Sequence, residues 1–252
     1  MEIKINKAGL DGKVGDEMVK AVDKVIIALD YKSFDDVKKL TELLGNEIKY
    51  YKVGLELFLN EGARIIDYLH SIGKEIFLDL KFHDITNTVK MACEYAAGKN
   101  IFMFNIHAAC GMNTMTEVAK MLEEKKSKSI CIAVTVLTNM NENEIKEIYH
   151  TDYSLKETSE NLTRFTKSSG LHGVVCSAQE AKMIKNQFGE KFITVCPGVR
   201  PEWADKNDQK RVMTPKEAIE NGADFLVIGR PVTKAKDPKK AVQMIREEIE
   251  KN

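Results

Sequence analysis

Short runs of apolar, mostly β-branched residues alternate along this chain with longer stretches in which apolar residues recur at helical spacing. Polar or glycine residues bound each run, which is the pattern of a strand buried on both faces of a parallel sheet. Eight such runs predict strands over residues 24–29, 49–53, 75–80, 101–106, 130–137, 173–176, 192–196 and 224–228.

The stretches between the runs predict amphipathic helices that end at glycine. In the first helix, Ser33 is placed to cap the N-terminus, Val37, Leu40 and Leu44 share a face, and Gly45 is placed to end it. The last helix is expected over residues 242–249. The same order of residues precedes Gly73, Gly98, Gly170, Gly189 and Gly222.

Eight strand-then-helix units in 252 residues predict a single-domain α/β fold of the (β/α)8 TIM barrel type. We expect the barrel over residues 24–252, with residues 1–23 as an N-terminal extension packed on it. A doubly wound open sheet is the alternative, but it normally has fewer strands. Its phosphate-binding G-x-G-x-x-G is also missing after the first run, where residues 30–33 read D-Y-K-S.

Composition and charge narrow the class of protein. Thirty-eight basic residues balance 38 acidic ones, so net charge implies no nucleic-acid partner. The five cysteines are odd in number and widely spaced, which predicts reduced thiols rather than disulfides or a zinc site. The longest apolar run is far too short to cross a bilayer, so we expect a cytoplasmic protein with no membrane partner.

Polar residues close several of the predicted strands. Active sites of such barrels lie at the carboxyl ends of the strands, so side chains there are expected to converge on one mouth. Each residue alone is more simply explained as a solvated charge, but five or more together indicate a site. The residues at strand ends are Asp30, Lys52, Asp79, Lys81, His107, Thr138 and Arg230.

The densest of these clusters reads D-L-K-F-H-D over residues 79–84. Strand alternation would point Asp79 and Lys81 to the same face, with Asp84 one turn further on. If Lys52 also faces inward, the array alternates in sign as Lys52, Asp79, Lys81, Asp84. A structural salt bridge is the simpler interpretation, but a stacked array of this kind also suits a proton-donating lysine beside a fixed negative charge.

A second cluster, around Gly229 and Arg230, suits a phosphate. Backbone N–H groups near the glycine and the guanidinium of Arg230 are able to hold such an anion. After the seventh strand, Pro197 and Arg200 belong to a facing loop that runs to residue 215 with little periodicity. Long loops of this kind are often lids that close on a ligand.

The motifs D-L-K-F-H-D-I, V-T-V-L-T, C-P-G-V-R-P, D-Q-K-R-V-M-T-P and I-G-R-P occur here in this order. In this combination the chain resembles the prokaryotic, monofunctional orotidine 5'-monophosphate decarboxylase family. The resemblance runs from about residue 25 to the C-terminal helix. It implies a TIM-barrel lyase that converts orotidine monophosphate to UMP and carbon dioxide in UMP biosynthesis, with no cofactor and no metal. It also implies a homodimer with sites at the subunit interface.

The resemblance further implies roles for individual residues. Lys81 is expected to protonate C6, Asp79 to crowd the substrate carboxylate, and Lys52 to hold the array and the ribose. Asp84 and Thr88 are expected to reach the partner subunit's site. The remaining substrate contacts are expected from Asp30 on the ribose, Thr138 and Asn139 near the pyrimidine, Gln209 between base and phosphate, and Pro197, Arg200, Gly229 and Arg230 at the phosphate.

Two alternative functions remain open from the sequence. A magnesium-dependent decarboxylase or aldolase acting on a sugar phosphate would share Asp79, Lys81 and Asp84, but Lys52 opposes a metal there. A non-catalytic nucleotide-binding barrel would keep the phosphate-binding residues, but a protein that only binds its ligand gains little from the Lys/Asp array.

Overall fold

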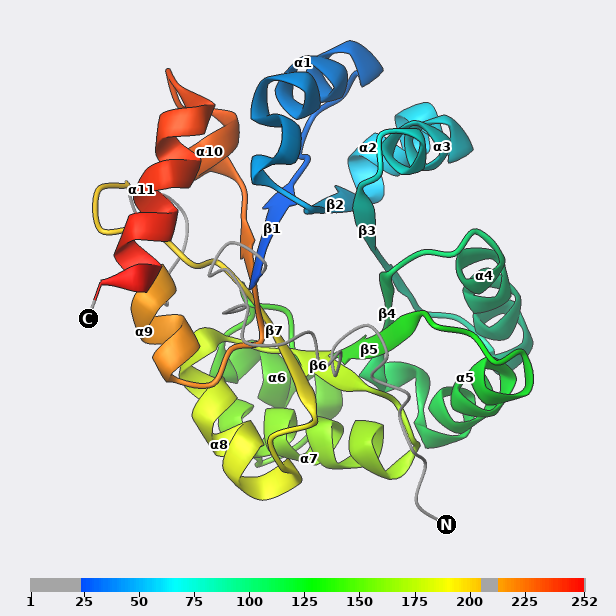
Figure 1. Ribbon diagram of the computed structural model, residues 1–252. Helices are drawn as coiled ribbons and strands as arrows, with labels where there is room; N and C mark the ends of the chain where they lie inside the picture. Colours follow the sequence, from blue (N-terminus) through cyan, green and yellow to red (C-terminus); the bar gives the residue numbers. More distant parts are fainter. Residues whose placement is uncertain (1–23, 205–212, 252) are drawn as a thin grey trace, which may run out of the picture.

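A computed structural model describes residues 24–204 and 213–251 of the chain. Its eight strands are all parallel and close into a barrel in sequence order, with β1 paired to β8. Figure 1 shows the helices arranged around this barrel. The predicted single-domain (β/α)8 barrel is therefore confirmed, and the open-sheet alternative is wrong because the last strand pairs with the first. The predicted extension, residues 1–23, lies outside the described residues.

The strands are short, as expected where a closed barrel buries them on both faces. They are β1 (Val25–Ala28), β2 (Tyr50–Gly54), β3 (Glu75–Phe82), β4 (Met103–His107), β5 (Ile130–Val134), β6 (Gly173–Val175), β7 (Ile193–Pro197) and β8 (Phe225–Ile228).

The α-helices lie between the strands or follow the last one. They are α1 (Phe34–Leu44), α2 (Leu55–Glu61), α3 (Ala63–Ser71), α4 (Thr86–Gly98), α5 (Met112–Glu124), α6 (Glu142–Tyr149), α7 (Leu155–Ser168), α8 (Ala178–Phe188), α9 (Pro215–Glu220), α10 (Arg230–Thr233) and α11 (Pro238–Glu250). Short 3-10 helices follow α1 (Gly45–Glu47) and β4 (Ala108–Cys110). None of the helices within the described part of the chain is long and apolar enough to cross a membrane.

Local sequence signals account for most of these boundaries. Ser33 caps α1 by accepting a hydrogen bond from the backbone N–H of Asp36, and Gly45 follows the helix with a φ of 50°. Two expectations were wrong. Gly98 is the last residue of α4 rather than its cap, and the left-handed residue after that helix is Asn100 at φ 54°. The fifth run was expected to stay extended to residue 137, but β5 ends at Val134.

The core has two parts, one inside the barrel and one between the strands and the helices. Alternation sends every second strand residue inward, and the inner cluster contains Ile26, Tyr50, Phe77 and Met103. The next inward position is two residues further along each strand, toward the carboxyl end. There the side chains become polar on three neighbouring strands, and this change from apolar to polar builds the mouth.

All five cysteines are free thiols, as predicted, and four of them are buried. The thiols of Cys176 and Cys196 lie 3.8 Å apart on the neighbouring strands β6 and β7. Burial raises the pKa of the partly exposed Cys110 thiol to about 11, with the neighbouring Cys93 thiol contributing. These thiols therefore pack as small apolar side chains.

Candidate functional site

Four charged side chains form a continuous array across the carboxyl ends of β1, β2 and β3. The ammonium of Lys52 lies 3.1 Å from Asp30 Oδ1 and 3.6 Å from Asp79 Oδ2. The ammonium of Lys81 lies 2.6 Å from Asp79 Oδ1. The signs therefore alternate as Asp30, Lys52, Asp79, Lys81, with each cation beside a carboxylate.

The array is only partly buried, which leaves it accessible from the mouth. The side chains of Lys52 and Asp79 are 13% and 15% exposed, whereas that of Lys81 is 40% exposed. Among the described residues, Asp79 alone accepts a hydrogen bond from the Lys81 ammonium. The other two hydrogens of the Lys81 ammonium are therefore available to a ligand in the mouth.

Two glycines leave room for these charged groups. A Cβ at Gly54, the last residue of β2, would lie 2.8 Å from the Lys52 ammonium. A Cβ at Gly229, which follows β8, would lie 3.3 Å from Asp30 Oδ2. Side chains at these two positions would displace the charges, so the glycines are part of the site's shape.

The carboxyl group of Asp79 has a pKa below its ordinary value. Burial alone would raise it, but the positive charges of Lys52 and Lys81 and hydrogen bonds from Lys81 and Asn105 outweigh that effect. Asp79 is therefore held as a carboxylate, which gives the mouth a fixed negative charge between two cations.

Lys81 reaches Asp79 by a route that simple strand alternation did not predict. Its φ is 52°, a left-handed conformation that non-glycine residues rarely adopt. The pairing of β3 with β4 shifts register between Leu78 and Phe82, which is a bulge in β3. The predicted contact is confirmed, but the bulge rather than regular alternation produces it.

Asn105 is a site residue that sequence reasoning missed. It lies on β4, is fully buried, and donates a hydrogen bond from Nδ2 to Asp79 Oδ1 at 2.7 Å. Its Oδ1 accepts the backbone N–H of Lys81 at 2.8 Å. A lone amide in an apolar strand, two residues after Met103, was the available signal.

Within one chain, no hydrogen bond or ion pair among the described residues joins Asp84 or Thr88 to the array. Both are exposed, and Asp84 accepts a hydrogen bond from the backbone N–H of Ile85 at 2.7 Å. No ion pair joins Asp84 to Lys81 among the described residues, so the expected array that ended at Asp84 is wrong for a single chain. The array instead begins at Asp30.

Two histidines stack beside the array, outside the roles that the sequence assigned. The rings of His83 and His107 are 5.0 Å apart and 14° from parallel. Burial lowers the pKa of His107, and its electrostatic interactions with the nearby His83 and Lys81 side chains add to that effect. The Nδ1 of His107 accepts the backbone N–H of Ala109, so this ring is a neutral, fixed element of the β4 end.

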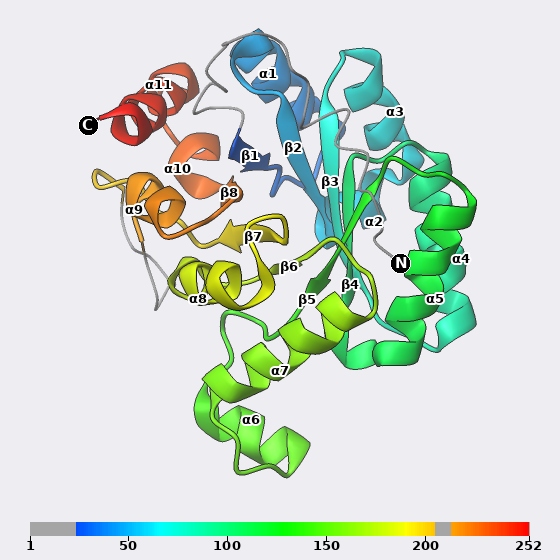
Figure 2. The ribbon, with the colours of Figure 1, turned by 60° about the horizontal axis from the view of Figure 1, so that its bottom comes forward.

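The expected pyrimidine-reading residues lie in the connection after β5. Thr138 and Asn139 are exposed and sit in a turn before α6. Figure 2 shows α6 projecting from the barrel beyond α7. Among the described residues, no hydrogen bond or ion pair joins Thr138 or Asn139 to the charged array.

The expected phosphate-binding residues lie at the carboxyl ends of β7 and β8 or in the connections that follow them, and Gly229 adjoins Asp30 of the array. Pro197 ends β7, and Arg200 is 5% exposed, with its backbone N–H donating to Met213 O. Gly229 and Arg230 link β8 to α10, and the carbonyl of Gly229 accepts two backbone N–H groups of that helix. Gln209 lies outside the described residues.

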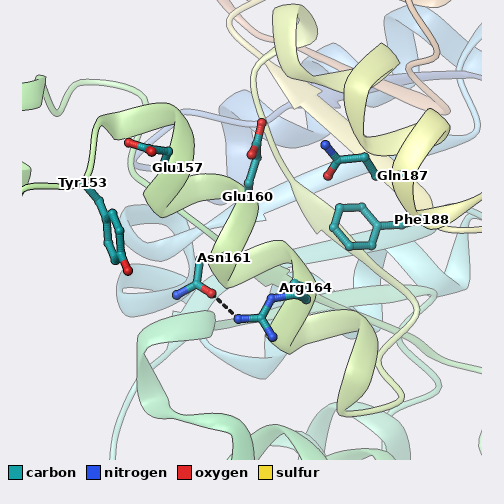
Figure 3. A pocket seen from close by; sticks show the side chains of 7 residues that line it. All are labelled: Tyr153, Glu157, Glu160, Asn161, Arg164, Gln187 and Phe188. Atoms are coloured by element: carbon teal, nitrogen blue, oxygen red, sulfur yellow. Dashed lines mark hydrogen bonds between the residues drawn. The ribbon is translucent and has the colours of Figure 1, made fainter.

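A hollow of about 320 Å³ on the outside of the barrel is lined by none of the site residues described above. It lies between α7 and α8 and is shown in Figure 3. Its Arg164 is hydrogen-bonded to Asn161 and packs over the ring of Phe165, and its Glu157 caps α7. The charged groups there serve the helices, so the barrel mouth remains the candidate active site.

Comparisons with known proteins identify the family to which the chain belongs. The model of the family described as "Orotidine 5'-phosphate decarboxylase / HUMPS family" matches residues 23–245. The chain is 45% identical over 215 residues to a Marinomonas protein named orotidine 5'-phosphate decarboxylase, covering 85% of this chain and 91% of that one. It is 42% identical over 227 residues to a Streptococcus sanguinis protein of the same name, covering 90% and 97%.

Solved structures give the same result. A Lactobacillus acidophilus structure titled orotidine 5'-phosphate decarboxylase matches with a TM-score of 0.80 and 34% identity, covering 91% of this chain and all of that one. An uncharacterized conserved protein from Geobacillus kaustophilus matches with a TM-score of 0.78 and 35% identity, covering 89% and 99%. The chain therefore belongs to the orotidine 5'-phosphate decarboxylase / HUMPS family of enzymes.

Proposed function

We propose that this chain decarboxylates orotidine 5'-phosphate to UMP and carbon dioxide, as the last step of UMP biosynthesis and without a metal or organic cofactor. The observation that carries the proposal is the Asp30, Lys52, Asp79, Lys81 array at the barrel mouth. The relatives, 41–45% identical and named for this reaction, support the choice of substrate.

Lys81 is the proton donor in this proposal. Cleavage of the bond between C6 and the carboxylate releases carbon dioxide and leaves the electron pair on C6, where the pyrimidine ring offers no ordinary delocalisation. A preorganised ammonium stabilises such localised charge and then supplies the proton that forms the C6–H bond. Lys81 is left as a neutral amine and regains a proton from water.

Asp79 and Lys52 prepare the site for that step. The Asp79 carboxylate, ionised between two cations, lies 2.6 Å from the Lys81 ammonium and holds it in place. It also faces the substrate carboxylate, a repulsion that is relieved as carbon dioxide leaves. Lys52 and Asp30, 3.1 Å apart, are assigned to the ribose hydroxyls.

The phosphate and the base are assigned to the other half of the mouth. Arg230 and the backbone at Gly229 bind the phosphate, with Pro197 and Arg200 at the base of the facing loop and Gln209 between base and phosphate. Thr138 and Asn139 read the pyrimidine. Because a charged hydrogen bond contributes about 1.5 to 3 kcal/mol, Arg230→Ala is expected to raise KM by about 10-fold or more.

A second copy of the chain completes the site in this proposal. Asp84 and Thr88 are exposed beside apolar side chains that are unusually accessible, Ile85 at 74% and Met91 at 62%. Burying that face in a symmetric dimer would bring both polar residues toward the partner's mouth. Mixing inactive Lys81→Ala and Asp84→Ala chains should then restore about a quarter of the wild-type activity, because half of the dimers regain one site.

The alternative within the family's range is magnesium-dependent chemistry on a sugar phosphate. The position of Lys52 speaks against it, because the ammonium fills the space between the carboxylates of Asp30 and Asp79. A divalent cation would need those oxygens as ligands.

The first test follows the loss of the orotate chromophore by ultraviolet absorbance, with and without EDTA. Rapid decay that EDTA leaves unchanged is the expected result. Tight binding of UMP without decay would favour a non-catalytic nucleotide-binding barrel. Activity on sugar phosphates that is lost in EDTA would overturn the proposal.

A further inference from the structure

The bulge in β3 leaves one residue of β4 opposite three residues of β3. Leu78 pairs with Phe104 and Phe82 pairs with Ile106, so Asp79, Leu80 and Lys81 all lie across from Asn105. A bulge interrupts the backbone ladder, and the N–H groups inside it need other partners. Two of the four charged residues of the array, Asp79 and Lys81, lie within this interrupted stretch.

The side chain of Asn105 replaces the missing ladder. Its Oδ1 accepts the N–H of Lys81 at 2.8 Å, and its Nδ2 donates to Asp79 Oδ1 at 2.7 Å. Asp79 Oδ1 also accepts the Lys81 ammonium at 2.6 Å. One amide therefore holds both the left-handed backbone of Lys81 and the carboxylate that binds the end of its side chain.

The amide of Asn105 matches the hydrogen-bonding needs of both neighbours. A carboxylate accepts hydrogen bonds and a backbone N–H donates them, so the residue between them must carry one donor and one acceptor. Aspartate would place two carboxylates in contact. An aliphatic residue would remove the acceptor of the Lys81 N–H and one of the donors to Asp79. Asn105 is fully buried, so water does not compete for either bond.

We propose that Asn105 is a positioning residue that holds Lys81 and Asp79 in their reactive arrangement through these two hydrogen bonds. The proposal rests on the proposed decarboxylation for its kinetic consequences, but not for its structural ones. Because Asn105 is fully buried and bonded to Lys81 and Asp79, it acts through these two residues. Its loss is therefore expected to reduce kcat and to leave KM within about twofold.

Two variants separate the two hydrogen bonds. Asn105→Ala removes both, and kcat is expected to fall by about 10- to 100-fold, the range for a buried hydrogen bond to a charged group. Asn105→Asp keeps the acceptor for the Lys81 N–H but loses the donor to Asp79. The matched control is Met103→Leu, a buried change of similar volume on the same strand and face, which is expected to leave kcat unchanged.

The pH dependence of Asn105→Asp gives a signature that a merely structural role would lack. Two adjacent carboxylates bind a shared proton, and the carboxyl group introduced by this substitution regains a donor toward Asp79 when it is protonated. The kcat of this variant relative to wild type should therefore rise as pH is lowered from about 8 to 5. The charged groups facing Asp79 are Lys52 and Lys81, with Asp30 beyond Lys52 and the histidines His83 and His107 beyond Lys81.

Amide hydrogen exchange tests the structural half without any substrate. The Lys81 N–H is expected to exchange about 10-fold or more faster in Asn105→Ala, and at the wild-type rate in Asn105→Asp and Met103→Leu. Unchanged exchange in Asn105→Ala, or a kcat within twofold of wild type in that variant, would overturn the proposal. A wild-type chain without decarboxylase activity would refute the proposed function alone, because the exchange rates still decide the role of Asn105.

Discussion

Two lysine–aspartate pairs lie at opposite ends of the barrel, each with 2.6 Å between the ammonium and the carboxylate. They differ in how many hydrogen bonds the ammonium makes to the protein. At the amino end, Lys185 of α8 pairs with Asp224, directly before β8. Its ammonium also donates to the carbonyls of Glu190 and Phe192, which uses all three of its hydrogens. At the carboxyl end, the Lys81 ammonium has Asp79 as its one hydrogen-bond partner among the described residues.

The two lysine side chains also differ in their exposure to solvent. The Lys185 side chain is 5% exposed and that of Lys81 is 40% exposed. A lysine whose donors are all satisfied by the protein holds a loop to a helix. A lysine with donors still directed at an open mouth is available to a ligand. The distance between the charges is the same, so the number of unused donors separates the structural pair from the candidate catalytic one.

Among the substitutions that test this difference, replacing Lys81 should have the largest effect, a loss of activity. Lys81→Ala is expected to reduce decarboxylation by at least about a thousandfold, or roughly 4 kcal/mol of transition-state stabilisation, because the proton donor is lost. Turnover is measured from the loss of orotate absorbance, and UMP binding by calorimetry should survive. Turnover near the wild-type value would contradict the assignment.

Replacing Lys185 should instead lower the stability of the protein and leave its activity unchanged. Lys185→Met leaves two carbonyls and Asp224 without their buried donor, and the free energy of unfolding should fall by about 2 to 3 kcal/mol. The remaining folded protein should keep its kcat, since the pair lies at the far end of the barrel. Urea denaturation measures the stability, and turnover per folded molecule measures kcat. A large loss of kcat without a loss of stability would contradict the interpretation of Lys185 as a structural residue.

A smaller effect is expected from a methyl group beside Lys52. Gly54→Ala places a Cβ 2.8 Å from the ammonium, which shifts and weakens its contacts with Asp30 and Asp79. We expect kcat/KM to fall by about 10-fold with little loss of stability, because a flexible side-chain end is what moves. Gly98→Ala is the matched control: no neighbour lies within 4 Å there, so activity should be unchanged.

The smallest expected effect is the contribution of Asp79 to the pH dependence of the free energy of unfolding. Its pKa is lowered in the folded state, so the carboxylate contributes stability above its unfolded pKa and loses it as pH falls through the folded value. Between about pH 5 and pH 3 the wild-type protein should lose more unfolding free energy than Asp79→Asn. Denaturant titrations over that range measure the difference, and parallel curves would show that folding does not lower the pKa of Asp79.

The charged part of the site was largely predictable, because it follows from where the strands end. Lys52 and Asp79 each lie two residues after an inward aromatic residue, Tyr50 and Phe77. Met103 and Asn105 repeat that spacing on β4, so the same periodicity could have identified Asn105. An uncharged residue inside an apolar run attracts less notice, although its hydrogen bonds join Asp79 and Lys81.

The sequence by itself determined the order of strands and helices, the closed barrel and the end of it at which polar residues gather. Those features depend on local periodicity and on capping residues, which the chain carries within a few positions of each other. Only the tertiary structure decided which charges touch. The bulge opposite Asn105, the left-handed Lys81 and the exclusion of Asp84 from the array depend on register between strands, which residues far apart in sequence set together.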